Sequence, residues 1–195
     1  MIKINKLKYK SIIFEGPNNC GKSTLIKMLK KDLDEYNFIH FGPPEKFVVD
    51  KSSFIIQEYN EIYKQLELMK ISKNINIFDR SAFGGTFYYG IKYRRYDVDD
   101  IIGFKNFIKK YHPKNDYVYI IVKRNLDKLK EYYDRNFIQY DEIEEDYNYY
   151  YFKFYNLLLN DLNIKNVLFL DIVENDIEKT YNNLLKLLLK EGVKE

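Results

Sequence analysis

The sequence has little of what characterises secreted, fibrous or membrane proteins. It contains one cysteine, four prolines, eight glycines and no tryptophan in 195 residues. The lone Cys20 excludes an internal disulfide, which is compatible with a reducing compartment. No apolar run approaches the roughly 20 residues of a transmembrane helix, and residues 1–10 lack the apolar segment of a signal peptide. We therefore expect a soluble protein without a membrane partner, in the cytoplasm or in the cytoplasm of a host cell.

A surplus of charge of one sign is also missing. The 32 basic and 29 acidic residues leave a formal net charge of +3, which does not indicate a partner as large as an extended nucleic acid. Small anionic ligands suit this balance better. Hydrophobic residues make up 46% of the chain and aromatic residues 17%, which is enough for a substantial core. The length favours a single domain over 1–195.

Short apolar runs alternate with longer segments of helical periodicity. The runs predicted as strands are residues 10–16, 36–42, 74–80, 116–123 and 166–172. The segments predicted as helices are residues 24–33, 51–71, 98–111, 125–135, 141–162 and 174–191. Because strands and helices alternate, we expect a five-stranded parallel sheet covered on both faces, which is a three-layer α/β/α fold.

One motif carries most of the chemical information. Residues 16–23 (GPNNCGKS) fit G-x-x-x-x-G-K-[ST] and lie between a predicted strand and a predicted helix. In such a loop the backbone N–H groups face phosphate, Lys22 reaches the β- and γ-phosphoryl oxygens, and Ser23 is placed to ligate Mg²⁺. We therefore expect ATP and Mg²⁺ as cofactors. The residues expected to bind the phosphates of ATP are Gly16, Asn18, Asn19, Cys20, Gly21, Lys22, Ser23 and Thr24.

A second constellation follows the third predicted strand, where Asp79 and Arg80 emerge together. In a parallel α/β sheet, ligands bind at the carboxyl ends of the strands. Asp79 can hold Mg²⁺ through water or orient an attacking oxygen, and Arg80 can lie between donor and acceptor phosphates. Both are therefore candidate catalytic residues, and Asp79 with Ser23 forms the candidate metal site.

The phosphate-binding loop alone does not identify the reaction, because GTPases, ATPase machines and kinases share this loop. A GTPase would require a guanine-binding segment such as N-K-x-D, which the sequence lacks. A large ATPase machine would require a longer chain. A small-molecule kinase is the leading class.

Three segments resemble the thymidylate kinase and deoxynucleoside kinase group, particularly its short phage- and virus-type deoxynucleoside monophosphate kinases. They are IIFEGPNNCGKST, NINIFDRSAFGGTFYYG and YVYIIVKRNLDKLKEYYDR. The resemblance covers most of the chain in order, and the phosphate loop is its specific part. It implies a P-loop kinase fold with a helical lid after the fourth strand, at about residues 125–150.

The resemblance implies that Arg135 is a lid arginine that closes over the donor phosphates. Where thymidylate kinases often carry another lid arginine four residues earlier, this chain has Glu131. Arg94, beside Arg95, is a candidate to replace that charge or to hold the acceptor phosphate.

The acceptor site is expected at the ends of the first three strands, where aromatic rings can stack on a base or exclude a ribose 2′-hydroxyl. Many thymidylate kinases also place an acid inside the loop, where this chain has Asn18 and Asn19. The expected acceptor residues are Glu15, His40, Phe41, Arg80, Phe83, Phe87, Tyr89 and Arg94.

Together these features favour a nucleotide kinase that transfers the γ-phosphoryl group of ATP to a deoxynucleoside monophosphate, with dTMP preferred. A deoxynucleoside kinase is the nearest alternative, and it requires a carboxylate beside the acceptor hydroxyl, either Asp79 or Glu15. An ATP-binding regulatory protein without efficient transfer, and a polynucleotide 5′-kinase, stay open as further alternatives. Self-association into a homodimer is also left open.

Overall fold

The computed structural model describes residues 7–42, 50–93, 96–134 and 140–189. Its centre is one parallel sheet with the strand order β2-β3-β1-β4-β5. The strands are β1 (Ser11–Glu15), β2 (Tyr36–His40), β3 (Ile75–Asp79), β4 (Tyr117–Lys123) and β5 (Val167–Asp171). The central strand β1 leads into the phosphate loop, so this loop lies between the ends of β3 and β4.

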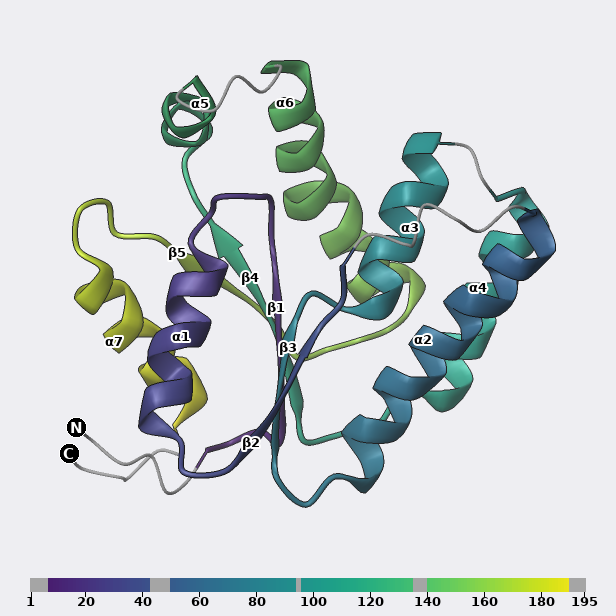
Figure 1. Ribbon diagram of the computed structural model, residues 1–195, viewed down its shortest axis with the longest axis horizontal. Helices are drawn as coiled ribbons and strands as arrows, with labels where there is room; N and C mark the ends of the chain where they lie inside the picture. The colour runs from purple at the N-terminus through teal and green to yellow at the C-terminus, as the bar shows by residue number, and fades with distance from the viewer. Residues whose placement is uncertain (1–6, 43–49, 94–95, 135–139, 190–195) are drawn as a thin grey trace.

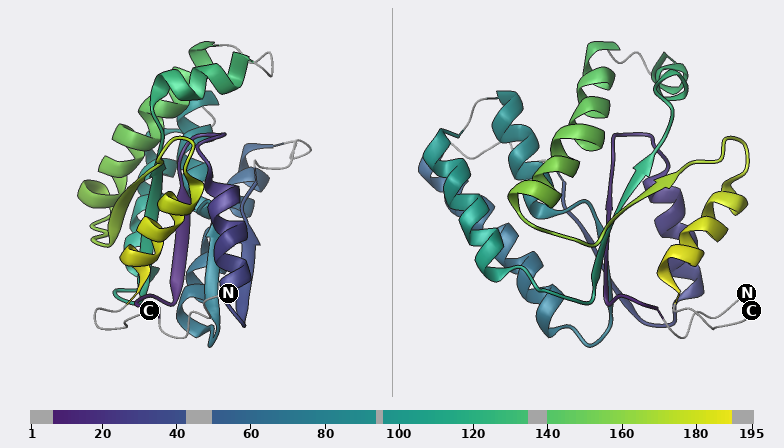
Figure 2. Two further views of the ribbon diagram at one scale, coloured as in Figure 1. Left: turned by 90° about the vertical axis from the view of Figure 1, so that its left-hand side faces the viewer. Right: turned by 180° about the vertical axis from the view of Figure 1, so that it is seen from behind.

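Helices cover both faces of the sheet. They are α1 (Lys22–Asp32), α2 (Lys51–Ile71), α3 (Ala82–Tyr93), α4 (Val98–Tyr111), α5 (Leu126–Asp134), α6 (Tyr140–Asn148), the π-helical η1 (Tyr149–Phe154) and η2 (Leu157–Asp161), and α7 (Ile177–Leu188). Figure 1 shows α1 and α7 on one side of the sheet and α2, α3 and α4 on the other, and the views in Figure 2 agree. None of the helices in the described part is long and apolar enough to cross a bilayer.

Successive side chains of the central strands point to opposite faces of the sheet, and this produces two hydrophobic cores. Ile12 and Phe14 of β1 are fully buried against α1 and α7, whereas Ile13 is fully buried against α2, α3 and α4. A strand that is buried on both faces reads as a continuous apolar run, which is why the strands could be recognised in the sequence. The five-stranded parallel sheet and the three-layer fold are confirmed.

The helix α3 is absent from the sequence-based prediction, which was wrong in leaving residues 82–93 outside the helices. Gly84 and Gly85 weaken the helical pattern there, because glycine is a poor helix former. Tertiary contacts require Gly84, since a Cβ at this position would lie 2.7 Å from both Glu15 Oε1 and Ser81 Oγ. Gln65 of α2 accepts a hydrogen bond from Ala82 N at 2.7 Å and so satisfies the first turn of α3.

The lid region predicted at about residues 125–150 contains α5 and α6, and Figure 1 shows both beyond the carboxyl ends of the strands. The long helix predicted over 141–162 continues from α6 into η1 and η2. This places the aromatic run Tyr149–Phe154 directly after α6 and against the sheet.

His112 provides a test of the packing around α4. Its ring contacts Pro113 O at 2.8 Å and Tyr119 Oη at 3.1 Å, and burial lowers its pKa from 6.5 to about 4. Because the unfolded chain takes up a proton below pH 6.5 and the folded chain does not until near pH 4, stability falls with acidification over this window. We expect this group alone to remove on the order of 3 kcal/mol of the free energy of unfolding between these pH values.

Urea titrations of wild type and His112→Gln at pH 7 and pH 4.5 measure this effect. The variant should lose less stability than wild type over that interval. An equal loss in both proteins would contradict the assignment.

Candidate functional site

The phosphate loop depends on backbone conformations that few residues adopt. Gly16 has φ +136° and Gly21, which precedes α1, has φ +101°. A Cβ on Gly16 would lie 2.7 Å from Val122 O of β4, so the loop approaches the neighbouring strand more closely than any side chain permits. Asn19, with φ 59°, is also left-handed, which asparagine tolerates better than most residues. The loop therefore folds tightly above the end of β4.

Lys22 is directed back into this loop from the first turn of α1. Its Nζ donates to Gly16 O at 2.8 Å and to Pro17 O at 2.7 Å, and it lies 3.7 Å from Cys20 Sγ. The side chain is buried, and burial lowers the pKa of the ammonium from its ordinary value. A buried cation inside a phosphate loop is positioned to interact strongly with an anionic ligand.

Ser23 and Asp79 line the same groove, although they come from α1 and β3. Across the described residues, no group of three or more His, Cys, Asp or Glu side chains could hold a metal ion. The pair of Ser23 and Asp79 fits Mg²⁺, which commonly keeps several waters and binds through one or two protein oxygens together with substrate phosphates. Ser23 Oγ and the Asp79 carboxylate are the oxygens that would hold it. Thr24, the second hydroxyl, is exposed beside Ser23.

Arg80 reaches across the site from the end of β3. Its backbone is left-handed, with φ 72°, and its N–H donates to Phe14 O at 2.9 Å. The guanidinium donates to Gly16 O at 3.2 Å, to Asn18 Oδ1 at 2.7 Å and to Tyr150 Oη. Arg80 is therefore held at the mouth of the phosphate loop by contacts with the loop and with η1.

Glu15 is the least solvated acid of this region. It is fully buried, and its Oε1 accepts from Ser81 N at 2.7 Å and from Ser81 Oγ at 2.5 Å. Its Oε2 has no hydrogen-bond partner among the described residues. Burial raises the pKa of this carboxyl, although Arg80, Ser81 and Lys22 oppose the shift. An unpartnered, buried carboxylate oxygen is a more basic group than a solvated one.

The other expected acceptor residues do not converge on one point. His40 Nδ1 lies 3.1 Å from Asp79 Oδ2, so this imidazole faces the candidate metal-binding acid. Phe41 stacks on Phe78, and Phe83 and Phe87 are buried in the core shared with α2 and α4. Arg94 and Arg135 lie outside the described residues, as does the side chain of Tyr89 on α3.

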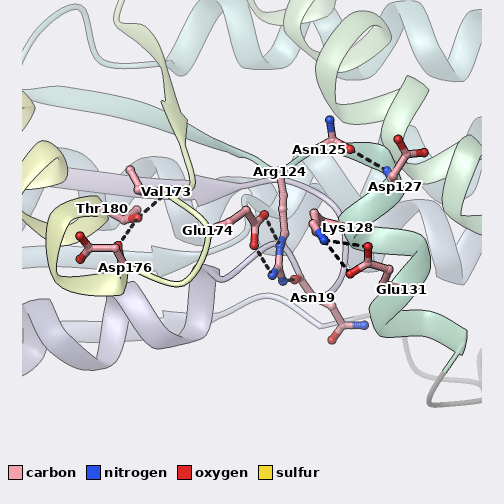
Figure 3. Close-up of polar contacts among 10 residues, drawn as sticks. All are labelled: Asn19, Arg124, Asn125, Asp127, Lys128, Glu131, Val173, Glu174, Asp176 and Thr180. Atoms are coloured by element: carbon pink, nitrogen blue, oxygen red, sulfur yellow. Dashed lines mark hydrogen bonds and ion pairs between the residues drawn. The ribbon is translucent and has the colours of Figure 1, made fainter.

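Two residues that the sequence analysis did not select complete the loop's surroundings. Arg124, just after β4, donates to Asn19 O at 3.1 Å and forms a two-point ion pair with Glu174, at 2.9 and 2.8 Å. Figure 3 shows Arg124 between the phosphate loop and the segment after β5. The Arg124 guanidinium holds the pKa of Glu174 below its ordinary value. No local pattern marks this pair, because its members are 50 positions apart.

Tyrosines of η1 support both arginines. Tyr150 Oη accepts from Arg80, and Tyr151 Oη accepts from Arg124 N at 3.1 Å while donating to Val122 O at 3.0 Å. These tyrosines therefore contact the guanidinium of Arg80 and the backbone of Arg124.

Solved structures share this arrangement of sheet, loop and helices. A deoxyadenosine kinase from M. mycoides has a TM-score of 0.57 and 17% identity, covering 90% of this chain and 97% of that one. YorR from Bacillus subtilis has a TM-score of 0.58 and 19% identity, covering 91% and 94%. Thymidylate kinase from Candida albicans has a TM-score of 0.59 and 14% identity, covering 94% and 92%.

The chain has a P-loop kinase fold. At these identities the likeness concerns the fold. No protein-family model matches the chain, and no curated protein matches it.

The contacts of Arg124 predict energetic coupling with Glu174. A partly exposed ion pair is typically worth less than ~1 kcal/mol, and the two-point geometry favours the upper end of that range. In a double-mutant cycle with Arg124→Gln and Glu174→Gln, measured by urea unfolding, we expect a coupling of about 1 kcal/mol.

The exposed Glu67–Lys70 pair of α2 provides the matched control, and its single-bond geometry should give a smaller coupling. Strictly additive effects of the two Arg124–Glu174 substitutions would contradict the role of this pair.

Proposed function

We propose that the chain is an ATP- and Mg²⁺-dependent nucleotide kinase whose acceptor is a deoxynucleoside monophosphate, with dTMP preferred. The observation that carries the proposal is the position of Arg80. Its guanidinium contacts the phosphate loop at Gly16 and Asn18 while its backbone is anchored on the central strand. A cation held there can contact both a donor γ-phosphate and an acceptor phosphate.

In this proposal the chain acts by positioning and by electrostatics. ATP–Mg²⁺ supplies the phosphoryl group. Lys22 and Arg80 balance its charge while a bond forms from the acceptor oxygen to the γ-phosphorus and the bond to the β-phosphate breaks. Ser23 and Asp79 hold the metal, and α5 and α6 exclude water as part of the lid. Arg135 stays a proposed lid residue on the strength of the sequence resemblance.

A monophosphate acceptor needs no protein base, because its attacking phosphate oxygen is already ionised near neutral pH. A nucleoside acceptor differs, since its 5′-hydroxyl must lose a proton during transfer. Glu15 is the observation that favours this second candidate, a deoxynucleoside kinase, because its Oε2 is buried near Arg80 and finds no partner in the part of the chain that the structure describes. The M. mycoides enzyme of the same fold was solved with the products dCMP and dCDP, so the acceptor class requires a direct test.

Arg80→Lys separates charge from geometry. Lysine keeps the positive charge but cannot donate two parallel hydrogen bonds to a phosphate. We expect kcat/KM for dTMP to fall roughly 100-fold, with changes in both KM and kcat. Steady-state kinetics with dTMP, dGMP and thymidine measure this.

Arg124→Lys is the comparison variant, because it makes the same exchange on the other side of the loop, and it should change the KM for dTMP less than Arg80→Lys does. Normal dTMP kinetics in Arg80→Lys would reject the proposed contact of Arg80 with the donor and acceptor phosphates. Wild-type transfer to thymidine with no transfer to any monophosphate would reject the preferred acceptor class.

Glu15→Gln distinguishes the two acceptor classes. Without a base, transfer to a nucleoside should fall roughly 100-fold or more, whereas transfer to a monophosphate should change only a few-fold. Because burial raises the pKa of Glu15, wild-type activity toward a nucleoside should decline on acidification at a pH above the ordinary titration range of glutamate.

Ser81→Ala is the matched control, because it removes one hydrogen bond to the carboxylate and keeps the carboxylate itself. It should retain transfer to nucleosides and move the acidic limb of the pH profile to higher pH. Equal nucleoside kinetics in Glu15→Gln and wild type would exclude Glu15 as the base.

A further inference from the structure

A groove lies outside the phosphate loop, between α1 and the edge strand β2. Its volume is about 340 Å³, and its lining includes three lysines of α1 and two aromatic residues of β2. One end reaches Ser23 and Asp79. The groove therefore reaches the candidate metal-binding residues at one end, and the proposed transfer does not use its lysines or its aromatic side chains.

The strand order explains why the groove exists. Among the strands that the structure describes, β2 lies at the edge of the sheet and pairs with β3 alone. Tyr36 and Phe38 lie two positions apart on β2 and so project from the same face, toward α1. Phe38 is 41% exposed, a large fraction for an aromatic side chain beside a helix. The sheet therefore presents a flat apolar wall there.

The opposite wall is basic. Lys27, Lys30 and Lys31 have the spacing that places helical side chains on one face. Within the described ranges no ion pair joins any of the three to a carboxylate. Lys30 Nζ lies 4.0 Å from the centroid of the Phe38 ring and 5.5 Å from that of Tyr36.

Other charged groups limit where an anion could lie. Asp79, at the far end, faces His40. Asp32, which follows the lysines in α1, accepts a hydrogen bond from Tyr181 Oη of α7 at 2.6 Å. An anion would therefore lie at the lysine end, away from Asp79, with any flat ring against the exposed part of Phe38.

From these features we propose that the groove is a second nucleotide site, which binds a nucleoside triphosphate without transferring its phosphates. Three cations that pair with no carboxylate in the described part of the chain suit a triphosphate, and the aromatic wall suits a base. The volume lies at the small end of ligand pockets, which span roughly 300–1,000 Å³, so the groove fits a mononucleotide better than a polymer.

The test counts nucleotides bound per chain by equilibrium dialysis at saturating ATP–Mg²⁺ and, separately, dTTP–Mg²⁺, without acceptor. Wild type should bind two molecules of at least one of these nucleotides. Lys27→Glu combined with Lys31→Glu should bind one fewer. The matched control is Lys179→Glu combined with Lys186→Glu on α7, which makes the same change in net charge on exposed positions of the same layer and should bind as wild type does.

Phe38→Ala should weaken the second binding event roughly 10-fold, the size of a lost base–aromatic stack. Lys22→Ala separates this proposal from the proposed kinase function, because it affects the phosphate loop and should leave the binding that depends on Lys27 and Lys31. A single bound nucleotide in wild type with both probes, or an unchanged count in the Lys27/Lys31 variant, would overturn the second site. If that variant instead changed only the sedimentation of the protein, the groove would be a contact between two copies of the chain, which also rejects the proposal.

Discussion

The close approach of Gly16 to the backbone of β4 is the constraint on which the site depends. A Cβ there would lie 2.7 Å from Val122 O, so only glycine allows the loop to turn directly above this strand. This turn brings the loop between the ends of β3 and β4. Arg80 and Arg124 follow these two strands, and each donates to a backbone carbonyl of the loop. The tight turn thus determines which side chains surround a bound phosphate.

The two arginines differ in what balances their charge. Arg124 pairs with Glu174 at two points and remains partly exposed. Arg80 has no carboxylate at hydrogen-bond distance in the described contacts, and its partners are carbonyl, amide and phenol oxygens. A cation satisfied by neutral groups keeps more of its charge available to an anion than one paired with a carboxylate. Arg124 therefore acts mainly by positioning the loop, and Arg80 is the better candidate for contact with phosphate.

The aromatic segment η1 connects α6 to this arrangement. Tyr150 and Tyr151 contact the two arginine residues, while Tyr149 donates to Gly84 O of α3 at 2.9 Å. η1 continues directly from α6. These tyrosines therefore connect α6 with Arg80 and Arg124 by direct contacts.

The sequence alone determined the layered fold and the phosphate loop, because both depend on short-range patterns. Strands buried on both faces read as apolar runs, and a loop that folds on its own backbone needs glycine at particular positions. Asp79 and Arg80 could also be selected, since they directly follow a recognisable strand. The tertiary structure alone decided the contacts between distant segments. It paired Arg124 with Glu174, placed Phe83 and Phe87 in the core and made a helix of a segment with two glycines. It also left Oε2 of Glu15 without a partner within the described ranges. Such outcomes depend on which residues the fold brings within a few ångströms of one another, and no local periodicity records that distance.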